Sequence, residues 1–251
     1  MNEANTPTST ALVQGDAKRA MVRQMFDAIS PRYDVVNRMI SVGLDNSWRR
    51  RTVKALGLPA RSRVLDLACG TGDFCRLLSE NDIEVVGIDM SEGMLRAART
   101  DAGLVLGDAA SLPFSEGAFD GVVSGFALRN FVALEAVCSE LARVVRPGGR
   151  IGLLDVAIPT GVIGRTGYRV WFEHAVPAIG GLFSDAAAYR YLPASVEYLP
   201  APERIRLMLR NAGFSAVGRR TFTAGTTQLF TATRAGSPQS FDRRRESLVA
   251  S

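Results

Sequence analysis

Short apolar runs alternate with amphipathic stretches over most of this chain. Helical spacing of the apolar residues at 17–29 predicts a helix that ends at Ser30-Pro31, and residues 134–145 predict another. Buried strands are predicted by apolar runs at 64–67, 83–88, 119–125 and 149–156. Strands that alternate with helices in this way are typical of an α/β fold.

The segment from Arg63 to Asp73 joins one of these strands to a helix through a glycine-rich turn, Gly70-Thr71-Gly72. The two glycines lack the Cβ atoms that would keep a ligand away from the backbone. The helix that follows directs unpaired N–H groups over the turn. The segment therefore predicts a nucleotide-type site at the carboxyl edge of a parallel strand.

The residues around the turn indicate which nucleotide binds. A dinucleotide fingerprint needs a third glycine where this chain has Cys75. An acid, Asp66, instead stands at the end of the strand before the turn. This order of strand, acid and Gly-Thr-Gly resembles the first motif of class I S-adenosylmethionine (SAM) methyltransferases. The resemblance implies a doubly wound, seven-stranded, Rossmann-like α/β fold, SAM as cofactor and S-adenosylhomocysteine as its product.

A second strand ends in Asp89, close to the spacing of about 20 residues at which an acid meets a ribose in βαβ nucleotide sites. A carboxylate can accept charge-assisted hydrogen bonds from both ribose hydroxyls. The alternative is that Asp89 caps the next helix, although Ser91 is itself a good cap. We therefore predict that Asp89 binds the ribose, with Met90 beside it.

Two later segments are similar to cofactor-binding segments of the same methyltransferases. In these enzymes the acid matching Asp108 takes the adenine amino group, and the next backbone N–H, here that of Ala109, faces the ring. The fourth strand ends at Ser124 and Gly125, which are expected to close the pocket. The expected cofactor-binding residues are Asp66, Gly70, Thr71, Gly72, Asp89, Met90, Asp108, Ala109, Ser124 and Gly125.

Composition bounds the class of protein. The 251 residues, 47% hydrophobic and 22% charged, are ordinary for a globular chain with one sizeable core. The net charge of +5 permits acidic partners but selects none, because the basic residues are dispersed. Three cysteines without CxxC spacing fit a reducing cytoplasm and argue against disulfides and metal binding. No signal peptide or membrane-spanning run is visible, so a cytoplasmic protein is expected.

The predicted elements fit a single domain over residues 17–235. Its expected parts are a helical lid (17–58), a SAM-binding half (59–157), a helical substrate cap inserted after the fifth strand (158–200), and a last helix with strands (201–235). The polar tails at 1–16 and 236–251 are expected to be disordered.

Several segments resemble signatures of the menaquinone/ubiquinone biosynthesis C-methyltransferase family, and the likeness extends over residues 20–235. These segments are Tyr33–Trp48, Phe126–Asn130, Arg143–Arg150, Tyr189–Val196, Ala212–Phe214 and Thr223–Gly225. The resemblance implies methylation of a ring carbon of a polyprenylated quinol, most simply demethylmenaquinol to menaquinol.

The chain departs from this family at several positions. Asp45 and Phe230 stand where the family has His, Gly125 where it has Ser, and Asp155-Val156-Ala157 where it has Glu-x-Ser. None of these changes the glycine turn, so they bear on the substrate and not on SAM. They leave open a second reading, a SAM methyltransferase for another small aromatic or polyketide-like acceptor. A nucleic-acid partner is not expected, since no RNA-binding domain or base-flipping motif accompanies the fold.

The reaction implied by the resemblance needs a stabilised phenolate, because a phenol titrates near pH 10. Arg129 is expected to stabilise that anion or to hold a water, since a guanidinium is no ordinary base. The alternative for Arg129 is a salt bridge on the helix that follows. Asn130 is expected to orient the other quinol oxygen. His174, the only histidine, is a candidate base, and the alternative is a core residue, which a single histidine among apolar residues more often is.

Tyr33 and Asp34 in the lid, and Tyr189 and Tyr191 in the cap, are further candidates for placing the ring. A lipid-tailed substrate raises the hypothesis of peripheral contact with the inner face of a membrane, through Arg49-Arg50-Arg51 and Lys54. A solvated helix face is the simpler interpretation of that cluster. The oligomeric state stays open, and a homodimer is compatible with the sequence.

Overall fold

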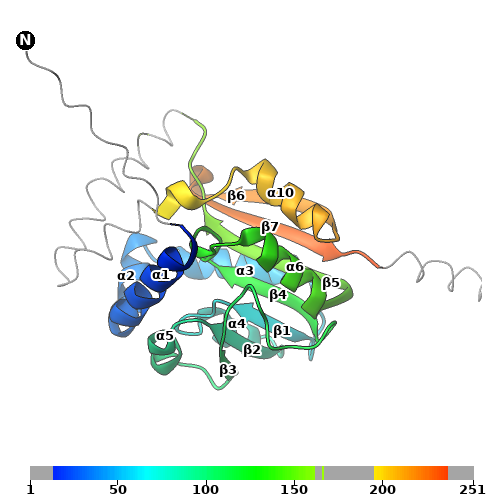
Figure 1. The fold of residues 1–251 in the computed structure, drawn as a ribbon, viewed down its shortest axis with the longest axis horizontal. Coiled ribbons are helices and arrows are strands. Elements are labelled where there is room, and N and C mark those ends of the chain that lie inside the picture. The colour runs from blue at the N-terminus through cyan, green and yellow to red at the C-terminus, as the bar shows by residue number, and fades with distance from the viewer. Residues whose placement is uncertain (1–13, 162–165, 167–194, 237–251) are drawn as a thin grey trace, which may run out of the picture.

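The computed structural model describes residues 14–161, 166 and 195–236 (Figure 1). Its strands form one sheet of seven, in the order β3-β2-β1-β4-β5-β7-β6. Strands β1 to β5 run parallel, and β7 runs antiparallel to both β5 and β6. The strands are β1 (Arg63–Leu67), β2 (Glu84–Asp89), β3 (Gly103–Leu106), β4 (Phe119–Gly125), β5 (Val145–Val156), β6 (Phe214–Phe222) and β7 (Thr227–Arg234).

The helices precede, connect and follow these strands. The α-helices are α1 (Gly15–Ile29), α2 (Tyr33–Ile40), α3 (Asp45–Leu56), α4 (Asp73–Ser79), α5 (Glu92–Ala97), α6 (Leu134–Val144) and α10 (Pro202–Asn211). Short 3-10 turns are η1 (Ser30–Arg32), η2 (Leu128–Asn130), η4 (Val196–Tyr198) and η5 (Thr223–Gly225). The predicted doubly wound α/β fold is therefore confirmed, and the first helix begins slightly earlier than expected, at Gly15.

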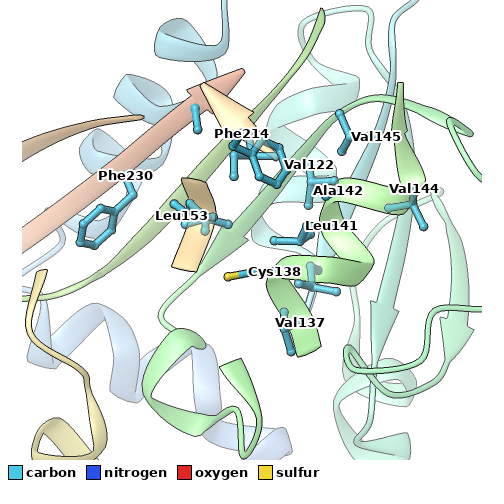
Figure 2. Close-up of a cluster of buried hydrophobic side chains, with 14 of the residues drawn as sticks. Val122, Val137, Cys138, Leu141, Ala142, Val144, Val145, Leu153, Phe214 and Phe230 are labelled. Atoms are coloured by element: carbon cyan, nitrogen blue, oxygen red, sulfur yellow. The ribbon is translucent and has the colours of Figure 1, made fainter. Parts of the chain in front are cut away.

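Alternation along the central strands builds a core on each face of the sheet, because successive strand residues point to opposite faces. Leu153 pairs with Phe230, and both belong to a core with the apolar side chains of α6 (Figure 2). Residues of α10 complete the same core. The adjacent strand residues Leu154 and Leu229 pair in the same register and pack on the other face with α3 and α4. Phe230, one of the departures from the family pattern, is thus a fully buried core residue.

The strand order reverses between β1 and β4, where the chain passes from one half of the sheet to the other. At such a switch point the connections leave the carboxyl ends of the two strands in opposite directions and open a crevice. The chain before the sheet, α1 and α2, lies beside this edge (Figure 1). The fold therefore places the glycine turn and the N-terminal helices together.

Some sequence predictions concern residues that the structure does not describe. Residues 1–13 and 237–251 of the expected tails and most of the cap at 158–200, including His174, Tyr189 and Tyr191, lie outside the described residues, whereas Gly15 and Asp16 belong to α1 and not to a tail. Among the helices that are described, none is long and apolar enough to cross a membrane.

Candidate active site at the carboxyl ends of β1 and β4

The turn after β1 depends on glycine at two positions. Gly70 and Gly72 have φ values of +54° and +85°, a left-handed conformation that side chains disfavour. A Cβ on Gly72 would also lie 2.9 Å from the Thr100 methyl carbon. Gly72 is the N-cap of α4, so the chain turns sharply from strand to helix as the sequence predicted.

Asp89, at the end of β2, is held by backbone donors beside this turn. Its two carboxylate oxygens accept hydrogen bonds from the N–H groups of Gly70 and Ser91, each at 2.8 Å. Burial raises the pKa of the carboxyl group, against the effect of these backbone donors. The N-cap of α5 is Ser91, whose hydroxyl oxygen accepts from the Met94 N–H at 3.1 Å. Ser91, and not Asp89, is therefore the N-cap of α5. The Asp89 carboxylate remains in position for a ligand.

A cavity of about 70 Å³ opens beside the turn and joins the ends of β1, β2 and β4 to the lid. The predicted site residues that line it are Tyr33, Gly70, Asp89, Met90, Asp108, Ala109, Gly125 and Asn130. The remaining predicted residues of the described part, Asp34, Asp66, Thr71, Gly72, Ser124 and Arg129, do not line it. Segments that are far apart in the sequence therefore converge here.

The residues that line the cavity have the chemistry to bind SAM, but the cavity is too small to hold SAM unless part of its wall moves. The glycine turn leaves backbone accessible, and Asp89 and Asp108 offer carboxylates for hydroxyl and amino groups. Ligand sites usually measure roughly 300–1,000 Å³, well above the volume seen here. Val22, Phe26 and Tyr33 of the lid enclose one side of the cavity. We infer that α1 and α2 move outward when SAM enters.

Polar contacts fasten the lid to the cofactor half. Asp27 of α1 accepts hydrogen bonds from the Ser91 hydroxyl at 2.6 Å and from the Gly93 N–H at 2.9 Å. Asp34 of α2 accepts one from the hydroxyl of Thr71 in the glycine turn. Asp34 and Thr71, both predicted as site residues, therefore join the lid to the glycine turn. Sequence gave no signal for Asp27, because it reads as an ordinary polar position of an amphipathic helix.

Asp108 makes a third lid contact. One of its carboxylate oxygens lies 3.3 Å from the Arg19 Nε, and the other accepts the Ala110 N–H at 2.9 Å. Both side chains of the ion pair are partly exposed, so solvent screens the attraction. An adenine amino group that binds Asp108 would share the carboxylate with Arg19.

Lys18 is a site residue that sequence reasoning missed. Its buried ammonium donates to the carbonyl oxygens of Arg129 at 3.0 Å and Phe131 at 3.3 Å, and lies 4.0 Å from the ring centre of Tyr198. Burial lowers the pKa of Lys18 to about 8. The two carbonyls flank Asn130, which lines the cavity.

The position of Lys18 in the sequence could have predicted that its side chain faces inward. Residues 18, 22 and 26 fall on one helical face, and Val22 and Phe26 line the cavity. A charged residue on that apolar stripe indicates an inward-facing ammonium, and not a solvated one.

Arg129 lies behind the cavity wall. Its guanidinium contacts an Asp155 carboxylate oxygen at 2.5 Å and donates to the Phe126 carbonyl at 2.7 Å and the Ser195 hydroxyl at 3.0 Å. The Asp155 side chain is fully buried. These contacts favour the salt-bridge alternative for Arg129, but its partner lies on β5 and not on the following helix, α6, as expected. Asn130 donates from its amide nitrogen to the Phe126 carbonyl at 3.4 Å.

Asp66 and Ser124 are structural in this arrangement. Asp66 is 1% exposed and accepts a hydrogen bond from the Cys75 thiol at 3.3 Å. Burial raises the pKa of Asp66 to about 7. The Ser124 hydroxyl donates to the Leu67 carbonyl at 2.8 Å, which ties β4 to β1.

The departures from the family pattern are accommodated by neighbours. A Cβ on Gly125 would lie 2.9 Å from the Phe74 ring, so no larger residue fits there without a shift. Asp155 carries the buried pair with Arg129, and the buried Ala157 donates its N–H to the Thr226 carbonyl at 2.8 Å. These positions are therefore packed consistently with one another.

The interpretation of Arg49-Arg50-Arg51 as a solvated face is wrong for Arg49. This side chain is buried and pairs with Asp45 at 2.5 Å and with Asp73, in the first turn of α4, at 2.9 Å. Asp45 stands one helical turn before Arg49, so the i, i+4 spacing of opposite charges was a usable signal. The Asp45 departure thus supplies a partner for a buried cation beside the glycine turn.

Comparison with known proteins shows the family to which the chain belongs. The model of the ubiE/COQ5 methyltransferase family matches residues 14–234. The chain belongs to this family. As a ubiE/COQ5 family member it is a SAM-dependent methyltransferase, which confirms the predicted enzyme class and cofactor.

Curated relatives are similar over most of their length. A demethylmenaquinone methyltransferase of Thermus thermophilus is 47% identical over 202 residues, 76% of this chain and 91% of that protein. A protein of the same name from Deinococcus radiodurans is 41% identical, over 78% and 86%. The ubiquinone/menaquinone biosynthesis C-methyltransferase of Syntrophotalea carbinolica is 39% identical, over 84% and 93%.

Solved structures confirm the fold of this family member. A SAM-dependent methyltransferase of Thermotoga maritima superposes with a TM-score of 0.60 at 18% identity, covering 84% of this chain and 99% of that one. Phosphoethanolamine N-methyltransferase 2 of Haemonchus contortus, solved with SAM, gives a TM-score of 0.57 at 17% identity, covering 76% and 53%. At these identities the likeness concerns the fold alone.

Proposed function

We propose that this enzyme transfers a methyl group from SAM to a ring carbon of a polyprenylated quinol, most simply demethylmenaquinol to give menaquinol. The observation that carries the proposal is that Phe126 and Asn130, from the segment resembling the quinol methyltransferases, line the same cavity as Gly70 and Asp89. The names of the curated relatives support the same substrate class.

In the proposed complex, four residues hold SAM, which supplies the electrophilic methyl group. Asp89 accepts from the ribose hydroxyls, and Gly70 presents its backbone to the ligand. Asp108 accepts from the adenine amino group, and the Ala109 N–H faces the ring. All four line the cavity in the present structure.

The quinol ring must be fixed with its reacting carbon about 3–3.5 Å from the methyl group. Asn130 lines the cavity and is proposed to orient a quinol oxygen. Tyr33 also lines it, and burial raises the pKa of its phenol, so the hydroxyl stays protonated and can donate to a developing phenolate. We propose that Arg129 acts indirectly, by holding the segment from Phe126 to Asn130 in place.

The proton acceptor is proposed to come from the substrate cap. His174 remains the candidate, with Tyr189 and Tyr191 as ring-placing residues, and all three lie outside the described residues. Because the tail of the substrate belongs in a bilayer, we also propose that the enzyme is a cytoplasmic protein that works at the inner face of the membrane.

The test is methyl transfer from radiolabelled SAM to a demethylnaphthoquinol, a demethylbenzoquinol, a panel of simple phenols and RNA, under reducing conditions. Transfer to a demethylquinol is expected. Transfer only to the phenol panel would favour another aromatic acceptor, and transfer only to RNA would overturn the proposal.

A variant pair separates cofactor binding from chemistry. Asp89→Ala is expected to weaken SAM binding by at least tenfold in calorimetry, because the buried carboxylate that grips the ribose is lost. Asp101→Ala, at an exposed loop position, serves as control. Normal SAM affinity in Asp89→Ala would refute the ribose assignment.

A further inference from the structure

One face of the lid exposes an apolar ridge. Val35, Met39 and Val42 are spaced so that they share one side of α2 and the turn after it, and Leu44 follows. Their exposed fractions are 50%, 42%, 66% and 40%. Val36, the next residue of α2 after Val35, lies off this ridge and is buried. Exposed apolar side chains gathered in this way mark an interaction surface.

A basic groove continues from the ridge onto α3. A surface hollow of about 440 Å³ is lined by Gly43, between Val42 and Leu44, and by Asn46, Ser47, Arg50, Arg51 and Lys54. The side chains of Arg50, Arg51 and Lys54 are exposed, as is that of Arg38 on α2. Arg51 also lies 5.4 Å from the ring centre of Phe222. The ridge and the groove thus form one continuous surface.

Acidic side chains on these helices face inward. Only Asp34 and Asp45 occur between residues 33 and 54. Asp34 accepts a hydrogen bond from Thr71, and Asp45 is 4% exposed and paired with Arg49. The acidic side chains of these two helices therefore leave Arg38, Arg50, Arg51 and Lys54 as the charges that the helices present to solvent, and Glu80, after α4, lines an adjoining hollow with Arg50 and Lys54.

We propose that the surface formed by Val35, Arg38, Met39, Val42, Leu44, Arg50, Arg51 and Lys54 docks the enzyme on an anionic lipid bilayer. Apolar side chains flanked by cations match the two layers of such a surface, acyl chains below and phosphate headgroups above. A partner protein would need acidic groups around an apolar groove. The bilayer fits better because this proposal rests on the proposed function, in which the substrate carries a lipid tail.

The position of α2 connects this surface with the active site. Tyr33 lines the cavity at the start of the helix, and Asp34 contacts Thr71 of the glycine turn. Val35 and Met39 point away from these contacts, into solvent. A bilayer bound to the ridge would therefore lie against the lid, on the outer side of a helix whose inner side faces the cavity. A quinol leaving the bilayer would have a short path to the ring site.

The docking test is flotation of the full-length protein with two kinds of vesicle. One kind consists of phosphatidylcholine alone, and the other contains about one third phosphatidylglycerol, an anionic lipid. Binding to the anionic vesicles at low salt is expected, with release at high salt. Val42→Asp and Met39→Asp should each reduce the bound fraction at least fivefold. Leu207→Asp is the matched control, because Leu207 is an exposed apolar residue (55%) on α10, away from the ridge.

Arg50→Glu combined with Lys54→Glu should likewise reduce binding to anionic vesicles at least fivefold. Arg204→Glu combined with Arg210→Glu on α10 is the charge-matched control. Absence of wild-type binding, or equal binding by Val42→Asp and the wild type, would overturn the docking surface.

Activity assays distinguish this surface from the proposed function. With a long-tailed demethylquinol embedded in anionic vesicles, Val42→Asp should lose at least fivefold in kcat/KM, while a short-tailed soluble demethylquinol should be methylated as by the wild type. Equal loss on both substrates would overturn the docking role. Vesicle binding without methylation of any quinol would overturn the proposed function and leave the docking surface standing.

Discussion

At the residue scale, the cavity is surrounded by buried ionisable groups, each of which has a specific partner. Asp66 is hydrogen-bonded to Cys75, Arg129 is paired with Asp155, and Lys18 caps two carbonyl oxygens. Removing water from a charge is costly unless such partners are present. These residues therefore make testable contributions to stability as well as to the shape of the site.

Asp66 should make the stability of the protein depend on pH. Its folded-state pKa of about 7 exceeds the ordinary value of 3.8, so between these values the folded state binds a proton that the unfolded state has released. The free energy of unfolding is therefore expected to fall as pH rises from about 4 to about 7, by up to about 4 kcal/mol.

Urea unfolding across this pH range measures the effect. Asp66→Asn should flatten the dependence, whereas Asp101→Asn, exposed after α5, should keep the wild-type slope. A wild-type slope in Asp66→Asn would mean that this carboxyl group is ionised in the folded protein.

Breaking the buried ion pair of Arg129 should lower the free energy of unfolding, and any loss of methyl transfer should follow from that destabilisation. Arg129→Ala leaves Asp155 as an unpaired buried charge, and such changes destabilise by about 3–5 kcal/mol. Arg129→Ala with Asp155→Ala should recover part of that loss. Denaturant melts of the single and double variants test this, and a fully stable, inactive Arg129→Ala would instead indicate direct contact with the substrate.

At the element scale, α1 and α2 act as a lid that is fastened by a few polar contacts at both sides of the cavity. Asp27 reaches the start of α5, and Lys18 reaches the carbonyls beside η2. The lid therefore bridges the cofactor half and the segment proposed to bind the quinol.

Loss of the Lys18 contact should weaken this bridge. Lys18→Met retains the apolar stem but frees the two carbonyls, and hydrogen bonds from charged groups contribute about 1.5–3 kcal/mol. We expect kcat/KM to fall by roughly tenfold to a hundredfold. Because the pKa of Lys18 is about 8, wild-type activity should also decline as pH rises through that value, and the variant should lack this decline. Arg23→Met, at an exposed position of the same helix, is the control, and unchanged kinetics in Lys18→Met would exclude the bridge.

At the scale of the whole molecule, sequence predicted the fold and the strand, glycine turn and helix around Gly70 well. The glycine turn, the strand that ends in Asp89 and the order of elements are local patterns, and local patterns survive in the fold. Predictions were weaker for side chains whose role depends on a partner that is distant in the sequence. Nothing near Arg129 in the sequence indicates Asp155, and nothing near Asp27 indicates Ser91, so their roles emerge only once the sheet brings them together.

The small cavity predicts a change in dynamics when cofactor binds. If the lid opens to admit SAM and closes on it, S-adenosylhomocysteine should slow amide hydrogen exchange in α1 and α2. Exchange in β5 and β7, which are buried centrally in the sheet, should change little. Exchange mass spectrometry with and without the ligand tests this, and unchanged lid exchange would mean that SAM enters without displacing α1 and α2.

The contact between Gly125 and the Phe74 ring has a consequence for engineering. Replacing unusual residues by the commonest residue of a family is a routine way to gain thermal resistance. Here the Cβ of the serine that the family resemblance implies at position 125 would lie 2.9 Å from the Phe74 ring. We therefore expect substitutions at the two positions to be energetically coupled, so that a consensus redesign of this enzyme would exchange both together.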